Sequence, residues 1–294
     1  MKSKIVLYLM NKKGYSVLKA LLDNKFTNYI EYIVGAKDEN VQKDYFKDIK
    51  ELCLYNDIEF YERTIDEIPK FDGYKIAIGW RWIISDSVKL IVFHDSLLPK
   101  YRGFAPLVNM LINGEKEIGV TSLFAEKSYD TGDIIHQISK KITYPIKIEE
   151  AIDEVSGLYD KLAIKISDEI VNDHKLPRRK QEEDKASYSL WRDYDDYFID
   201  WNNSSEKIKR KVDAVGFPYK GAKAFLNDKE ITINSCETVS DLNIENRDIG
   251  KVIFKEEDRP VVVCGKGLLK IIEAQFSETN QSIFPIEKFR SRFC

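Results

Sequence analysis

Residues 4–34 have the sequence KIVLYLMNKKGYSVLKALLDNKFTNYIEYIV, in which two apolar runs flank an amphipathic segment. The runs Lys4–Met10 and Tyr29–Val34 are apolar almost throughout, as in strands buried on both faces. Between them, Gly14–Asn24 repeats apolar side chains at helical spacing. The apolar positions on that side are Val17, Leu18, Leu21 and Leu22. This order predicts a parallel strand pair joined by a crossover helix.

The same alternation continues toward residue 94. Lys43–Tyr55 has a helical pattern, and three further apolar runs favour strands: Ile58–Tyr61, Ile76–Gly79 and Leu90–His94. Strands that alternate with helices predict an α/β fold, here a Rossmann-like, doubly wound and mostly parallel sheet. In such sheets, ligands bind beyond the carboxyl ends of the strands. We therefore expect a functional site just after Gly79 and around His94.

A second, smaller domain is predicted beyond residue 184. Lys147–Asp173 is a long amphipathic segment without proline, and the charged stretch His174–Asp184 that follows it favours a mobile, solvated linker. We therefore predict a catalytic domain at residues 1–184 and a β-rich, OB-like domain at residues 185–294. In the second domain we expect a helix at Ser204–Val215, then strands at Lys229–Ile233, Gly250–Phe254, Pro260–Cys264 and Leu268–Ala274.

Composition limits the classes of function. The chain has 43% apolar and 32% charged residues and a net charge of −3, so nothing attracts it as a whole to nucleic acid or anionic lipid. The apolar run Ile5–Met10 is too short for a membrane span or a signal-peptide core. The four cysteines show no CxxC or metal-ligand spacing. We expect a cytoplasmic protein with reduced thiols and no metal.

Two ionisable residues suggest chemistry. His94 ends a buried strand, and histidine suits proton transfer because its imidazole ionises near neutral pH. Position alone favours a structural histidine, but Tyr129–Ile135 adds a turn with a carboxylate at Asp130 that leads into another strand. The pair indicates a catalytic site, whereas His136 and His174 favour structural and solvated positions.

Three short motifs occur in order in this region. They are HDSLLP at His94–Pro99, KYRG at Lys100–Gly103 and DTGDII at Asp130–Ile135. Together they resemble the formyltetrahydrofolate-dependent formyltransferase family, which has the same spacing between histidine and aspartate. The likeness continues at Asn113–Glu115, Gly119–Thr121, Tyr197–Trp201 and Ala214–Ala222.

The resemblance implies transfer of a formyl group from 10-formyltetrahydrofolate to an amine, without a metal. By resemblance, His94 stabilises negative charge on the formyl oxygen, and Asp130 orients His94 and helps to move the proton from the attacking nitrogen. The resemblance places the pterin against the loop after Gly79. The expected folate-binding residues are Trp82, Ile83, Ile84, Tyr129, Thr131 and Gly132. Lys100, Tyr101 and Arg102 either meet substrate phosphates or brace their loop.

Val92 departs from the family pattern. The family normally has asparagine two residues before the histidine, and residues two apart on a strand point to the same face. Valine cannot donate a hydrogen bond, and such a donor is typically worth about 2.7–4 kcal/mol of barrier. Asn109 or Asn113 could supply another donor, or the enzyme could be slower and rely on His94, water and backbone groups. A third alternative is a protein that only binds folate or a nucleotide.

The acceptor amine has to be inferred from features outside this centre. From Trp191 onward the chain has 17 Lys and Arg against 18 Asp and Glu, whereas a methionyl-tRNA formyltransferase would be expected to have a basic carboxyl domain. Tyr101–Leu107 and the carboxyl segments look most like the sugar-nucleotide N-formyltransferases. We therefore expect a UDP- or dTDP-linked 4-amino-4,6-dideoxyhexose destined for a surface glycan, with methionyl-tRNA as the alternative. The resemblance also suggests a homodimer.

Overall fold

The computed structural model describes residues 3–286 and 288–294. The chain forms two compact units. The first unit comprises the residues up to Leu107 together with Glu117–Ile142 and Glu150–Trp191, and the second comprises Val108–Lys116, Thr143–Glu149 and Arg192–Cys294. The first unit thus extends past Asp184, the last residue of the predicted catalytic domain.

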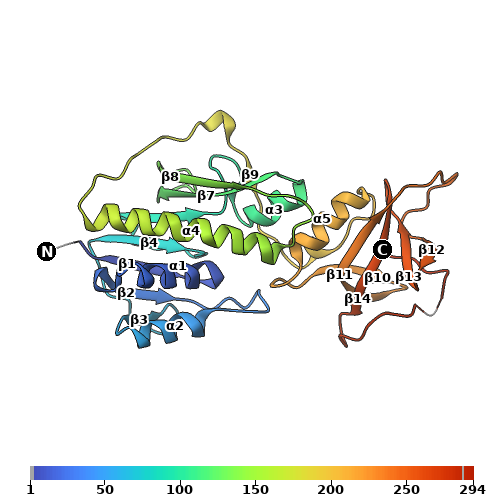
Figure 1. Ribbon diagram of the computed structural model, residues 1–294, viewed down its shortest axis with the longest axis horizontal. Coiled ribbons are helices and arrows are strands. Elements are labelled where there is room, and N and C mark those ends of the chain that lie inside the picture. The colour runs from blue at the N-terminus through green and yellow to red at the C-terminus, as the bar shows by residue number, and fades with distance from the viewer. Residues whose placement is uncertain (1–2, 287) are drawn as a thin grey trace. The chain divides into compact units, whose positions relative to one another are not determined.

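The first unit is built on a seven-stranded sheet with the order β3-β2-β1-β4-β5-β7-β8 (Figure 1). The five strands from β3 to β5 are parallel, and β7 and β8 are antiparallel. This confirms the predicted Rossmann-like, mostly parallel sheet. The strands are β1 (Ile5–Leu9), β2 (Ile30–Gly35), β3 (Glu59–Glu62), β4 (Tyr74–Ile78), β5 (Leu90–His94), β7 (Glu117–Phe124) and β8 (Ile134–Lys141).

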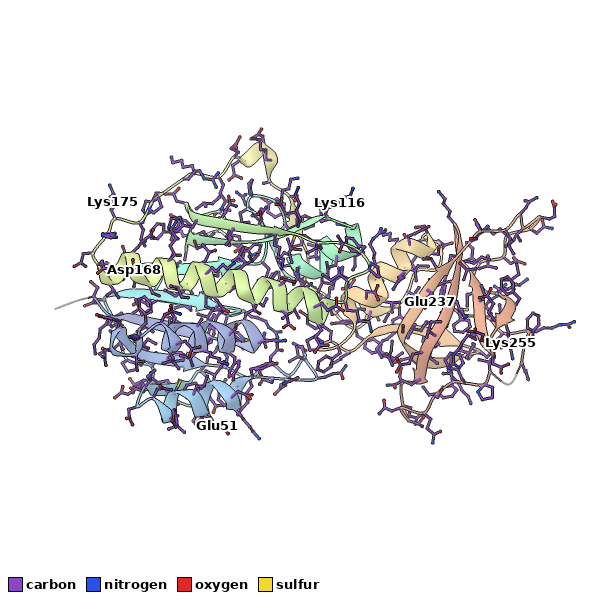
Figure 2. The ribbon with its side chains drawn as sticks, viewed as in Figure 1. Glu51, Lys116, Asp168, Lys175, Glu237 and Lys255 are labelled. Atoms are coloured by element: carbon purple, nitrogen blue, oxygen red, sulfur yellow. The ribbon has the colours of Figure 1, made fainter. Side chains whose placement is uncertain are left out.

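Helix α1 (Asn11–Asp23) packs closely on the sheet and begins three residues before the predicted Gly14. A Cβ atom on Gly14 would lie 3.1 Å from the Cβ of Leu9, so glycine allows this close approach. Helix α4 (Ile148–Val171) lies beside α1, because Ser16 Oγ donates a hydrogen bond to Asp160 at 2.8 Å. Glu51 on α2 (Phe46–Tyr55) and Asp168 on α4 are exposed (Figure 2).

The opposite face of the sheet has its own apolar cluster. Val6 and Tyr8 alternate with Leu7 and Leu9 along β1, so they point away from α1. The side chains that pack on this cluster come from β3, from β5 and mostly from loops, and they include Tyr61, Ile68, Phe71, Trp80, Ile84 and Val92. One face of the parallel sheet is therefore covered by loop residues that continue directly into its carboxyl edge.

The second unit contains a small antiparallel sheet with the order β10-β11-β14-β13-β12. The chain end closes this sheet, because Phe293 bridges to Leu226 and Arg292 bridges to Lys251. These contacts confirm the predicted β-rich unit. Its elements are α3 (Pro106–Asn113, which begins in the first unit), α5 (Ser205–Val215), β10 (Ala222–Leu226), β11 (Lys229–Val239), β12 (Val252–Glu256), β13 (Arg259–Val263) and β14 (Leu268–Phe276).

Short elements complete the chain. Strands β6 (Arg102–Gly103) and β9 (Tyr188–Ser189) pair in parallel, and single 3-10 turns occupy Thr27–Tyr29, Glu183–Lys185 and Asp195–Tyr197. Ser204 caps α5 by accepting a hydrogen bond from the backbone N–H of Lys207. Within residues 3–286 and 288–294, every helix is too short or too polar to cross a membrane.

Candidate active site

His94 lies at the carboxyl end of β5 and is buried. Its Nε2 is 2.7 Å from the carbonyl oxygen of Tyr101. A carbonyl oxygen can only accept, so Nε2 carries a proton in this hydrogen bond. Its Nδ1 faces Asp130, with 3.6 Å between Nδ1 and Oδ2. The structure thus brings together the two residues that the sequence predicts as the catalytic pair.

Asp130 sits in the turn between β7 and β8. Its Oδ2 accepts a hydrogen bond of 2.8 Å from the backbone N–H of Gly103. Its φ of 56° is in the left-handed region, which aspartate tolerates better than most residues. Two residues later, a Cβ atom on Gly132 would lie 1.8 Å from the carbonyl oxygen of Phe124. Glycine is therefore required for this turn to lie against the end of β7.

The loop after His94 is fixed by buried hydroxyl groups. Thr121 Oγ1 donates to the carbonyl oxygen of Ser96 at 2.6 Å and accepts from the N–H of Leu98 at 3.0 Å. Ser96 Oγ donates to the carbonyl oxygen of Lys100 at 2.6 Å. Because Thr121 is the β7 residue paired with His94, these bonds attach the loop to the same position of the sheet.

Asp95, next to His94, belongs to a buried polar cluster that the sequence analysis missed. Its carboxylate accepts hydrogen bonds from Lys13 on α1 and Tyr159 on α4. Burial alone would raise the pKa of Asp95, but the Lys13 ammonium and the hydrogen bonds from Lys13 and Tyr159 outweigh it and lower the pKa. Burial raises the pKa of Tyr159, and the negative charge of Asp95 adds to that shift. The cluster ties both helices to the residue beside His94.

Arg102 is almost fully buried and uses all five of its N–H groups within the protein. Nε and Nη2 donate to Gln181 Oε1 at 3.0 and 2.8 Å. Nη1 and Nη2 donate to the two oxygens of Glu183 at 2.8 and 2.7 Å, and Nη1 also lies 3.4 Å from the hydroxyl of Tyr188. The hydrogen bonds that Arg102 donates to the Glu183 carboxylate raise the pKa of Arg102. Of the two alternatives for Arg102, this geometry favours bracing of the loop over phosphate binding.

The segment 178–189, called the strap below, packs against the first unit instead of forming the predicted mobile linker. Arg179 and Ile134 exchange two backbone hydrogen bonds of 2.8 and 2.9 Å. The guanidinium of Arg178 lies 3.7 Å from the centre of the Phe124 ring. Figure 1 shows the strap passing the outer strands β7 and β8 before it reaches β9. The prediction of a mobile linker is wrong here, because charged side chains such as Arg178 contact the protein instead of the solvent.

The remaining predicted substrate residues flank Arg102. Lys100 is exposed, and the N–H of Tyr101 donates to Ser187 Oγ at 2.9 Å. Tyr101 has a φ of 59°, an uncommon value for an aromatic residue. This conformation directs its carbonyl oxygen to His94. Tyr101 therefore contributes to the site through its backbone.

The predicted folate-binding residues fall into two groups. Trp82 is half-buried, with its ring edge-on to Trp80 and the Arg63 guanidinium 4.2 Å from its centre. Ile84 packs on the loop-covered apolar cluster, whereas Ile83 is 79% exposed. In the turn beside Asp130, Tyr129 is 66% exposed and Thr131 Oγ1 donates to the carbonyl oxygen of Ser128 at 3.0 Å. Among the predicted folate-binding residues, Ile83 and Tyr129 thus have large exposed apolar surfaces.

Val92 packs as an ordinary apolar residue. Its side chain contacts the core group Leu98, Leu123 and Ile134. The two asparagines suggested as replacement donors both belong to the second unit, where Asn109 Oδ1 accepts a hydrogen bond of 2.5 Å from Arg192 and Asn113 is exposed at the end of α3. Within the described ranges, His, Cys, Asp and Glu side chains form no group that could hold a metal ion.

Comparison with known proteins identifies the family. The family model described as "Formyl transferase" matches residues 71–167, and the model described as "Formyl transferase, C-terminal domain" matches residues 193–289. A methionyl-tRNA formyltransferase of Syntrophomonas wolfei subsp. wolfei is 30% identical over 259 residues, which cover 83% of this chain and 81% of that protein. The chain belongs to the formyltransferase family.

Two further proteins are similar to this chain, one in sequence and one in fold. The bifunctional polymyxin resistance protein ArnA of Wigglesworthia glossinidia brevipalpis is 32% identical over 299 residues. That alignment covers 94% of this chain but 43% of ArnA, so the chain spans less than half of the relative. The crystal structure of WlaRD, a sugar 3N-formyl transferase in the presence of dTDP and 5-N-formyl-THF, has a TM-score of 0.68. It is 21% identical, and the match covers 98% of this chain and 99% of WlaRD.

Proposed function

We propose that this chain transfers the formyl group of 10-formyltetrahydrofolate to the amino group of a nucleotide-linked amino sugar. The observation that carries the proposal is the pairing of His94 with Asp130, 3.6 Å apart, at the carboxyl edge of the sheet in a member of the formyltransferase family. Ligands of such sheets bind at this edge.

In the proposed reaction, the uncharged amine attacks the formyl carbon and forms a tetrahedral intermediate. The Nε2 of His94 already donates to the carbonyl oxygen of Tyr101. His94 therefore offers Nδ1–H to the negative charge that develops on the formyl oxygen. Asp130 lies beside Nδ1 and receives the proton that leaves the attacking nitrogen. The bond from the formyl carbon to N10 of the folate then breaks, and N10 takes up that proton. No metal takes part in these steps.

The loop after β4 is proposed to hold the pterin. Trp82 and Ile83 follow β4, the strand beside β5, and therefore belong to the same carboxyl edge as His94. The exposed surfaces of Ile83 and Tyr129 are of the apolar kind that lines small-molecule sites. Thr131 and Gly132 shape the turn that presents Tyr129, and Ile84 anchors the loop to the core.

A sugar nucleotide is favoured as acceptor over tRNA. The second unit has no excess of basic residues, whereas binding to a nucleic acid requires cations that neutralise several phosphates. The fold likeness to WlaRD, which covers nearly the whole of both chains, also supports a sugar acceptor. Either UDP or dTDP would be the carrier, and Lys100, which is exposed in the loop that follows His94, could meet its phosphates. The four free cysteines fit an enzyme of the cytoplasm, and we expect it to be a homodimer.

Purified protein should be incubated with 10-formyltetrahydrofolate and a panel of UDP- and dTDP-linked 3-amino and 4-amino sugars. We expect a mass gain of one formyl group on one sugar and stoichiometric release of tetrahydrofolate. A parallel reaction with initiator methionyl-tRNA tests the alternative that its relatives suggest. Formylation of the tRNA alone would replace the proposal, and no transfer to any acceptor would favour a binding protein.

A further inference from the structure

We propose that Gln181 is a positioning residue that holds Asp130 in place for formyl transfer. This inference rests on the proposed function of Asp130. Gln181 Nε2 donates to the carbonyl oxygen of Asp130 at 2.7 Å and to that of Gly132 at 2.9 Å. The two N–H groups of the Gln181 amide therefore donate to the two carbonyl groups on either side of Thr131. The turn that presents the carboxylate is held from outside the sheet by a residue of the strap.

The orientation of the Gln181 amide follows from its other partner. Oε1 accepts from Nε and Nη2 of Arg102, and a guanidinium can only donate. The amide nitrogen must therefore face Asp130 and Gly132. Arg102 is itself fixed by the carboxylate of Glu183. A continuous set of hydrogen bonds thus runs from Glu183 through Arg102 and Gln181 to the backbone of Asp130.

The two chain neighbours of Arg102 contact the two members of the catalytic pair. The residue before it, Tyr101, accepts the hydrogen bond from His94, and the residue after it, Gly103, donates to Asp130 Oδ2. Asp130 is consequently held at its carboxylate by Gly103 and at its main chain by Gln181. Loss of the hydrogen bond from Gly103 or of that from Gln181 would let the carboxylate move relative to His94 Nδ1.

The backbone of Asp130 needs this support. A residue other than glycine persists in the left-handed region when the surrounding structure determines it, and such conformations are common at functional sites. The hydrogen bond from Gln181 is made to the carbonyl group of Asp130 itself. Removal of the amide donors should therefore let the turn relax and displace the carboxylate.

Two variants separate positioning of Asp130 from attachment of the strap. Gln181→Glu retains an acceptor for Arg102 but removes the donors to Asp130 and Gly132, whereas Gln181→Met removes both. We expect kcat to fall about 100-fold in each, as a displacement of about 1 Å costs in a preorganised site. The KM values for the formyl donor and the amine should stay within about twofold, because substrate contacts are retained. Lys180→Ala, at the exposed neighbouring position, should match the wild type.

A second measurement does not depend on turnover. The chain has three histidines, so the imidazole resonances of His94, His136 and His174 can be assigned by NMR with single substitutions. We expect only the His94 resonances to move in both Gln181 variants. A wild-type kcat together with unchanged His94 resonances would overturn the proposal. If the wild-type protein fails to transfer formyl groups, the proposed function is wrong, and the resonances alone decide whether Gln181 positions Asp130.

Discussion

The Nε2 of His94 donates a hydrogen bond of 2.7 Å to the carbonyl oxygen of Tyr101, and this bond fixes the direction of the imidazole. Nδ1 is thereby turned to Asp130 at a distance of 3.6 Å, which is longer than a hydrogen bond. Nδ1 therefore makes no hydrogen bond to the carboxylate. In the proposed reaction, a proton on Nδ1 is the group that would face the oxyanion.

Substitution of either member of the pair should abolish most of the activity without unfolding the protein. We expect His94→Ala and Asp130→Asn each to lower kcat by about 100- to 10,000-fold, the usual range for a general acid or base. Asp130→Asn is the sharper test because its side-chain oxygen can still accept from Gly103. Steady-state kinetics and circular dichroism measure the two effects.

The control for this pair is His136→Gln. The Nε2 of His136 lies 2.9 Å from the carboxylate of Glu169 on α4, so this histidine has a structural partner outside the catalytic pair. We expect turnover close to that of the wild type in this variant. Normal rates in His94→Ala or Asp130→Asn would remove the assignment of the catalytic pair.

Val92→Asn should raise the turnover number. Residue 92 points to the same face of β5 as His94, so an amide there can donate to the formyl oxygen. A single oxyanion donor is worth about 100-fold or more in other enzymes, and we expect a gain of at least about tenfold. The unfolding free energy should fall by about 1–3 kcal/mol, because the amide would lie among apolar partners such as Leu123. Val92→Ala, which lacks the donor, should show no gain.

Asp95→Asn tests the buried cluster through the pH dependence of stability. The pKa of Asp95 in the folded protein lies below its usual 3.8, so the charged carboxylate stabilises the fold above that pH. We expect the variant to lose up to about 3 kcal/mol at pH 7, because the Lys13 ammonium loses its charged partner. The difference should shrink as pH falls from 3.8 through the folded pKa, since the wild type then loses the same charge. Urea unfolding at pH 7 and at pH 3 measures this.

Asp160→Asn provides a comparison of opposite sign. Burial raises the pKa of Asp160, so the protonated carboxyl group is favoured in the folded protein. The stability that the protonated form contributes is lost as the pH rises through the folded pKa. We expect the amide variant to be relatively more stable at pH 7 than at pH 3. A difference for Asp95→Asn that does not change with pH would contradict the proposed charge pairing with Lys13.

The sheet was predictable because local patterns determine it. Leu90–His94 was predicted with the observed bounds of β5, since a continuous apolar run ending in a polar residue marks both the strand and its end. The position of His94 at the carboxyl edge followed from the fold rule. The first three residues of α1, Asn11–Lys13, are not predicted, because they are polar and precede the apolar positions that repeat at helical spacing. Gly14, the first residue of the predicted helix, permits the close packing on Leu9.

The strap could not be predicted in the same way. Its residues Arg178, Gln181 and Glu183 have the composition of a solvated linker, and no local period distinguishes a charged loop from a packed one. Their partners lie far away in sequence: Asp130 is 51 residues from Gln181, and Arg102 is 79 residues from it. Asp95 and Lys13, in the buried cluster, are likewise 82 residues apart. Long-range polar contacts of this kind depend on the tertiary arrangement.

Gly132→Ala should destabilise the turn that carries Asp130. A Cβ atom at this position would lie 1.8 Å from the carbonyl oxygen of Phe124, and backbone cannot move aside as a flexible side chain can. We expect a loss of about 2–4 kcal/mol in unfolding free energy together with a large loss of activity, as for other overpacked positions. The matched control is Gly157→Ala on α4, where a Cβ would meet no atom within 4 Å. There alanine should stabilise the protein by up to about 1 kcal/mol, because it favours the helix over glycine. Equal stability of the two variants would show that Gly132 is not required for steric reasons, and the turn would then be free to place Asp130 elsewhere.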